Sequence, residues 1–82
     1  MFYAYILKSD KDGKYYYGHT SNLENRLNYH NTGKVRSTKG KRPLKLHYYE
    51  GFNTKQEAVK RELFYKSIKG YNWLKQNKIT ER

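Results

Sequence analysis

The chain contains no cysteine, and with 82 residues it must hold its fold together by packing alone. A chain of this length forms one domain and buries only ~60–65% of the surface that its unfolded form exposes. Without cysteine there is no disulfide framework, zinc knuckle or cysteine nucleophile, which is consistent with a reducing compartment. The longest apolar run, Phe2 to Leu7, is far shorter than the ~20 residues that cross a bilayer. We therefore expect a single domain over residues 1–82 that is soluble, cytoplasmic and independent of membranes.

Positive charge is concentrated in residues 34–45, which we call the basic loop. The whole chain has a formal net charge of +11, with 18 lysines and arginines against seven acidic residues. The basic loop has no acidic residue and contains glycine, serine, threonine and proline, a composition typical of a loop. Such a loop suits contacts to a phosphate backbone, although it can also serve solubility alone. We expect it to bind nucleic acid through Lys34, Arg36, Lys39, Lys41, Arg42 and Lys45.

Three segments have the composition of β-strands. Residues 2–7 and 14–18 are rich in aromatic and aliphatic side chains and flank a polar turn that ends at Gly13. Two such runs around a short turn predict a β-hairpin, and residues 44–52 predict a third strand.

Two helices are indicated by the spacing of capping boxes. Ser21 and Glu24 predict a helix from near Asn22 to about residue 31, with Gly33 past its end. Thr54 and Glu57 predict a helix over residues 55–68 that stops at Gly70, and residues 71–76 suggest a short last helix. The resulting ββαβα order predicts an α+β fold, a small three-stranded antiparallel sheet flanked by helices.

Polar side chains fall on faces of both helices that should be apolar. Arg26 and His30 lie on or beside the stripe formed by Leu23 and Leu27, where they need partners or lose solvation. They are either structural, with the arginine reaching past the edge of the core, or part of a site.

Glu62 lies within the apolar sector of the second helix, which is marked by Ala58, Val59, Leu63 and Tyr65. Because glutamate is almost never fully buried without a partner, Glu62 requires a cation. Sequence alone does not separate an ion pair, for example with Arg26, from a metal site.

The chain has ten tyrosines, most of which we expect to pack on the sheet. A pair of phenols on adjacent strands of a basic protein can also hold or activate a water near a phosphate. The residues Tyr5, Tyr16-Tyr17-Gly18, Arg26, His30-Asn31-Thr32-Gly33-Lys34 and Glu62 form an ordered set along the chain.

This ordered set resembles the GIY-YIG nuclease superfamily, in particular small stand-alone members similar to the N-terminal nuclease domain of an excinuclease. Tyr5 matches the tyrosine of the first motif, and Tyr16 and Gly18 match the second. Arg26 matches the helix arginine and Glu62 the metal-binding glutamate. The first motif lacks its glycine and isoleucine, and His19 stands where some members have lysine.

The resemblance implies a single GIY-YIG-like nuclease domain, a metal-dependent endonuclease that hydrolyses phosphodiester bonds in DNA. It implies one Mg²⁺ or Mn²⁺ ion on Glu62, with Tyr5, Tyr16, Arg26 and His30 as the catalytic residues. Such an ion needs only one or two protein carboxylates, which suits a chain with few acids. His19 and the basic loop would contact the nucleic acid, and Gly18 would be structural.

The resemblance leaves the choice of substrate and partners open. DNA is favoured over RNA, and a structure-directed or repair-linked substrate is one option. A protein partner that supplies specificity is another option. The alternative from a different class is a non-catalytic DNA- or RNA-binding module on the same scaffold.

Overall fold

A computed structural model describes residues 1–81, in which three strands form one antiparallel sheet. Strand β1 spans Phe2–Ser9, β2 spans Tyr15–Thr20 and β3 spans Leu44–Phe52. The sheet order is β2-β1-β3, so β1 is central and β2 lies at one edge. The predicted hairpin, third strand and α+β class are confirmed.

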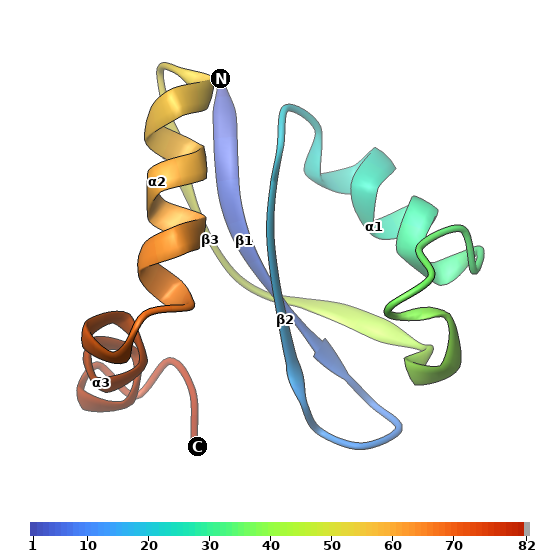
Figure 1. The fold of residues 1–82 in the computed structure, drawn as a ribbon. Coiled ribbons are helices and arrows are strands. Elements are labelled where there is room, and N and C mark those ends of the chain that lie inside the picture. The colour runs from blue at the N-terminus through green and yellow to red at the C-terminus, as the bar shows by residue number, and fades with distance from the viewer. Residues whose placement is uncertain (82) are drawn as a thin grey trace.

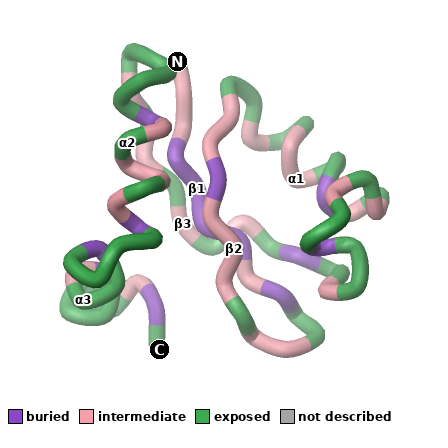
Figure 2. Tube along the Cα trace, viewed as in Figure 1, coloured by how far each residue is buried: buried purple, intermediate pink, exposed green. Residues whose placement is uncertain are grey.

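Helices cover both faces of the sheet (Figure 1). Helix α1 (Leu23–Asn31) and the basic loop lie on one face, and α2 (Lys55–Tyr65) and α3 (Ile68–Gln76) lie on the other. Alternate residues of β1 point into the two layers, because successive side chains of a strand face opposite sides. Ala4 and Ile6 pack towards α2 and α3, whereas Tyr5 and Leu7 pack towards α1. Figure 2 shows that burial is concentrated along β1.

The two predicted capping boxes have different outcomes. Thr54 caps α2 through the backbone N–H of Glu57, and the Glu57 carboxylate accepts from the Thr54 N–H, so the second box is confirmed. The first is wrong: Asn22, rather than Ser21, is the cap of α1, and its side chain accepts from the Asn25 N–H. Serine and asparagine are both favoured at the N-cap position, and here they follow one another in the sequence, so the spacing alone does not decide between them.

The C-terminal helices differ from the prediction. Helix α2 ends at Tyr65 instead of residue 68, and Ser67 starts α3 by accepting from the backbone N–H of Gly70. Gly70 therefore lies inside α3 rather than past the end of α2, and the order is ββαβαα. A Cβ at Gly70 would be 1.6 Å from the Phe64 carbonyl oxygen, so this glycine allows the two helices to approach closely.

Leu63 was predicted to face the core, but it is 60% exposed. Ala58 and Tyr65 are the buried residues of α2, so its contact face is narrower than the apolar residues suggested. No helix within residues 1–81 is long and apolar enough to span a membrane.

The basic loop is fixed at its base. The Asn31 side chain bonds to both the N–H and the carbonyl of Leu44, at 2.8 and 2.9 Å, and so joins α1 to the start of β3. The Ser9 hydroxyl donates to the Lys41 carbonyl at 2.6 Å. A short 3₁₀ turn spans Lys39–Lys41, and Lys45 already belongs to β3.

Candidate active site

A pocket of about 450 Å³ crosses the outer edge of β2. Its walls come from α1 and the basic loop on one side and from α2 on the other. Seven residues singled out from the sequence line it together: Tyr5, Tyr16, Gly18, His19, Arg26, His30 and Glu62. The fold therefore brings residues from two strands and two helices to one concave surface.

The Tyr5 hydroxyl enters the pocket over a strand position that has no side chain. Tyr5 and Gly18 are directly paired in the β1–β2 register, and Tyr5 is only 3% exposed. A Cβ at Gly18 would lie 2.3 Å from the Tyr5 Oη, much closer than an ordinary contact. The glycine is required here for space, because any side chain would displace the phenol.

The Tyr5 hydroxyl lies between a cation and an imidazole. The Arg26 Nε–H donates to the Tyr5 Oη at 3.2 Å, and the His30 Nε2 is 3.2 Å from the same oxygen. Arg26 also stacks against the ring of Tyr29, with 5.5 Å between the guanidinium carbon and the ring centroid. Arg26 and His30 are one helical turn apart, so α1 presents both to Tyr5.

His30 is held in its neutral form. It is 5% exposed, and burial, together with the nearby charge of Arg26, lowers the pKa of its imidazole. A neutral imidazole has one nitrogen that donates and one that accepts a proton. His30 can therefore accept a hydrogen bond from the neighbouring phenol.

Glu62 provides the opposite wall of the pocket. Its Oε1 is 2.7 Å from the His19 Nδ1, and its Oε2 accepts from the Lys66 Nζ at 2.6 Å. Burial acts to raise the pKa of Glu62, but the bonds from Lys66 and His19 outweigh it and hold the pKa below its ordinary value. An ionised carboxylate is thus maintained in the pocket. The Glu62–Arg26 ion pair considered from the sequence is wrong, because Glu62 pairs with Lys66 and His19.

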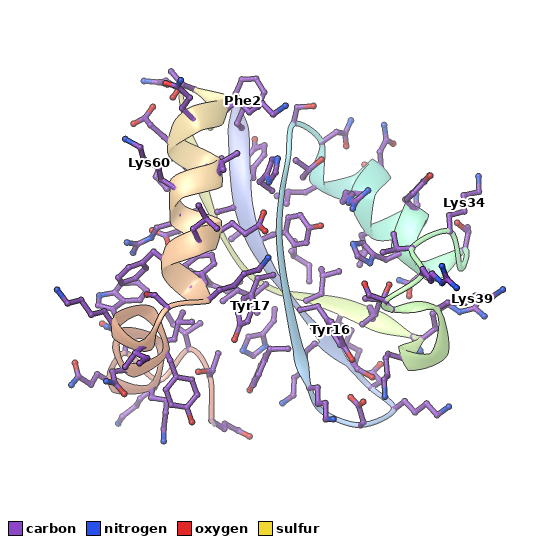
Figure 3. The ribbon with its side chains drawn as sticks, in the orientation of Figure 1. Phe2, Tyr16, Tyr17, Lys34, Lys39 and Lys60 are labelled. Atoms are coloured by element: carbon purple, nitrogen blue, oxygen red, sulfur yellow. The ribbon has the colours of Figure 1, made fainter. Side chains whose placement is uncertain are left out.

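The three consecutive tyrosines of β2 divide between the two sides of the sheet. Tyr16 pairs with Leu7 and packs on the side of α1, the same side as Tyr5. Tyr17 packs on the opposite side against Tyr65, with 6.0 Å between ring centroids. Figure 3 shows the two side chains on opposite sides of β2. Tyr16 is therefore the member of the run that lies on the Tyr5 side of the sheet.

The cations of the basic loop lie outside this pocket. Within residues 1–81, none of the six lines it, and Lys34 and Lys39 project from the far side of α1 and the loop (Figure 3). Two are partly neutralised by the β1–β2 turn: Lys41 is 3.1 Å from Asp12, and Lys45 is 3.6 Å from Asp10. Because these aspartates lie beside the loop, the net positive charge of this surface is smaller than the composition of residues 34–45 suggests.

Sequence reasoning missed two pocket residues that interact directly with the predicted site residues, Lys66 and Thr38. Lys66 follows Glu62 by one helical turn, a spacing that predicts an ion pair and was available in the sequence. Thr38 is 1% exposed and its Oγ1 is 2.8 Å from the His30 Nδ1. No local pattern distinguishes it from the solvated residues around it.

Comparison with known proteins identifies the class to which this fold and pocket belong. Residues 1–77 match the family described as the GIY-YIG catalytic domain. The chain belongs to this family of nucleases, which generally depend on divalent metals and act on nucleic acid. The match confirms the family resemblance that the ordered motifs indicated.

Several relatives share most of the chain. It is 45% identical to a UPF0213 protein of Bacillus licheniformis over 71 residues, covering 85% of this chain and 72% of that protein. It is 43% identical to a UPF0213 protein of Staphylococcus saprophyticus, covering 89% of each. The solution NMR structure of a UPF0213 protein from Bacillus halodurans superposes with a TM-score of 0.55 at 33% identity, covering 95% of this chain and 86% of that one.

Proposed function

We propose that this chain is a divalent-metal-dependent endonuclease that hydrolyses phosphodiester bonds in DNA, with a structure-directed or repair-linked substrate. The observation that carries the proposal is the Tyr5 hydroxyl, placed between the Arg26 Nε–H and the His30 Nε2 in a pocket that also contains Glu62. Phosphodiester hydrolysis needs an activated water and neutralised phosphoryl charge, and these groups supply both.

Tyr5 serves as the general base towards the attacking water. A free phenol has a pKa of ~10, so it needs a proton acceptor and nearby positive charge. His30 accepts the Tyr5 proton, and the Arg26 Nε–H stabilises the phenolate oxygen. Tyr16, on the same side of the sheet, orients the water.

Arg26 also binds the scissile phosphate. Its Nε–H is directed at Tyr5, which leaves the terminal nitrogens for a phosphoryl oxygen. His19 adds a second donor to phosphate once it leaves Glu62, and so replaces the lysine of some family members.

Glu62 is the residue that would hold one Mg²⁺ or Mn²⁺ ion. Within residues 1–81 there is no cluster of three or more acidic, histidine or cysteine side chains, and Mg²⁺ is commonly bound by one or two carboxylates plus water and substrate phosphate. Glu62 fits this ligand chemistry, since its carboxylate is ionised at the pocket wall and already attracts the ammonium of Lys66. When bound, the ion neutralises phosphoryl charge and stabilises the leaving oxygen.

The basic loop contributes the backbone contacts that hold nucleic acid against the pocket. Lys34, Arg36, Lys39 and Arg42 are available for phosphate, and Lys41 and Lys45 can exchange their aspartates for it. Such contacts are electrostatic and carry no base readout. Sequence specificity should therefore be low unless a protein partner supplies it.

The test is to incubate purified protein with supercoiled, branched and single-stranded DNA, with and without Mg²⁺ or Mn²⁺. Tyr5→Phe and Arg26→Ala are run in parallel with the parent, and binding is measured under the same salt conditions. We expect metal-dependent cleavage of at least one substrate and its loss in both variants, with binding largely retained.

The alternative, a non-catalytic binding module, gives a different pattern. Salt-dependent binding of DNA or RNA that survives both substitutions, with no substrate cut at any metal concentration, would establish it. An RNA arm in the same assay tests the preference for DNA.

A further inference from the structure

A buried threonine of the basic loop completes a hydrogen-bonded chain that ends on Tyr5. The Thr38 Oγ1 is 2.8 Å from the His30 Nδ1, and the Thr38 hydroxyl donates to the Val35 carbonyl at 3.4 Å. On the other side of the imidazole, the His30 Nε2 is 3.2 Å from the Tyr5 hydroxyl. The Arg26 Nε–H, at 3.2 Å from the Tyr5 oxygen, closes the chain.

The two ends of the chain determine its direction. A carbonyl oxygen only accepts, so the bond to Val35 uses the single hydroxyl proton of Thr38. The Thr38 oxygen must then accept from His30, which places the imidazole proton on Nδ1. Arg26 only donates, so the Tyr5 oxygen accepts from it and the Tyr5 proton is directed at the bare Nε2 of His30.

The opposite direction is less favourable. It would place two donors, the Arg26 Nε–H and the His30 Nε2–H, on the neutral Tyr5 oxygen. It would also turn the Thr38 hydroxyl away from the Val35 carbonyl. The Val35 carbonyl would then accept only from the Thr38 backbone N–H, at 3.1 Å.

We propose that Thr38 is a positioning residue that holds His30 in the tautomer with its proton on Nδ1, so that Nε2 is free to accept the Tyr5 proton. In the step that follows, the Tyr5 O–H bond breaks and an Nε2–H bond forms. The resulting phenolate accepts from Arg26 and from the imidazolium, whose Nδ1–H still donates to Thr38. This role rests on the proposed function of Tyr5, but the tautomer itself does not require that function.

The position of Thr38 also connects the basic loop to the pocket. Arg36 and Lys39, both exposed, flank Thr38 within the loop. Thr38 itself lines the pocket, so the basic loop contributes a buried hydroxyl to the pocket wall although its cations lie outside it.

The test is to determine the tautomer of His30 by long-range ¹H–¹⁵N correlation NMR on ¹⁵N-labelled protein at neutral pH. We expect wild-type His30 to show a protonated Nδ1 and a bare Nε2. Thr38→Val keeps the shape but removes the acceptor, and should move the proton to Nε2. Thr38→Ser restores the acceptor and should return it to Nδ1. The matched control is Thr32→Val, an exposed threonine outside the pocket, which should leave the tautomer unchanged.

Cleavage by the same proteins provides the second readout. Thr38→Val should lose about 10²-fold in cleavage rate, the size expected for a misplaced proton acceptor, and Thr38→Ser should recover most of it. A wild-type spectrum with the proton on Nε2, or a Thr38→Val spectrum that keeps it on Nδ1, would overturn the proposal. If Thr38→Val does not fold, the wild-type and Thr38→Ser spectra still decide. If the tautomers follow the expectation but the wild type cuts no nucleic acid, the proposed function alone fails.

Discussion

Replacing Gly18 with alanine tests the claim that this glycine exists to admit the Tyr5 hydroxyl. The added Cβ would lie 2.3 Å from the Tyr5 Oη and 2.5 Å from its Cζ, whereas ordinary contacts begin at 3.4 Å. The phenol must therefore move by about 1 Å to reach an ordinary contact distance. Its bonds to Arg26 and His30 are already 3.2 Å long, and a displacement of this size breaks them.

The expected cost falls on cleavage more than on folding. A misplacement of ~1 Å at a reacting group costs about 10²-fold in rate, while overpacking of a core costs ~1–3 kcal/mol. The assays are single-turnover cleavage of the DNA substrate and thermal unfolding. Gly40→Ala is the matched control, because a Cβ at Gly40 meets nothing within 4 Å.

A double variant makes the test specific. In a Tyr5→Phe background the hydroxyl is already absent, so adding Gly18→Ala should reduce cleavage little further. The reasoning is refuted if Gly18→Ala cleaves as fast as the parent. It is also refuted if the effects of the two substitutions multiply independently.

Three further predictions concern the charged groups. Lys66→Met should tighten Mn²⁺ binding by roughly 1.4- to 5-fold, measured by electron paramagnetic resonance, because a partly exposed ion pair contributes ~0.2–1 kcal/mol. Lys60→Met, in α2 and outside the pocket, should change nothing. The pKa of His30 is lowered on folding, so the unfolded state binds the proton more tightly than the folded state. His30 therefore has no effect on the free energy of unfolding above about pH 6.5, and lowers it as the pH falls from there towards the folded pKa. Thermal unfolding of His30→Gln should show a weaker decline over this pH range. Arg36→Ala should reduce the salt dependence of duplex binding by about one phosphate contact, a log–log slope of ~0.9, and Lys41→Ala by less, because an aspartate already pairs with Lys41.

Local signals predicted most of the fold. Two short runs rich in aromatic and aliphatic residues around a polar turn indicated the hairpin, and Thr54 with Glu57 indicated the start of α2, because both signals depend on residues a few positions apart. The alternation along β2 also separates Tyr16 from Tyr15 and Tyr17, since successive strand residues face opposite sides.

The end of α2 was predicted wrongly because contacts between two helices, rather than the local sequence pattern, determine where this helix ends. The apolar pattern after Tyr65 continues without a break, but the Ser67 cap and the close contact of Gly70 with the Phe64 carbonyl start a new helix. A glycine in a helical pattern indicates an end by default, and only the packing of two helices shows that it is internal.

The electrostatics of the candidate site also depended on contacts distant in sequence. Glu62 contacts His19, which lies 43 positions away in the sequence, and Lys41 forms an ion pair with Asp12 of the β1–β2 turn. Neither pairing can be predicted from residues that are neighbours in the sequence. The burial of Thr38 likewise results from the loop folding back onto α1, which its polar composition does not predict.

The central claim, metal-dependent hydrolysis at this pocket, is tested most directly by Glu62→Gln. The substitution keeps the size of the side chain and one acceptor oxygen, but replaces the other oxygen with an NH₂ donor and removes the charge that would hold the ion. With saturating Mn²⁺ and DNA, we expect the wild type to cut and Glu62→Gln to lose at least about 10²-fold in single-turnover rate while it binds DNA as tightly. Equal cleavage by the two proteins would contradict the assignment of this pocket as the active site.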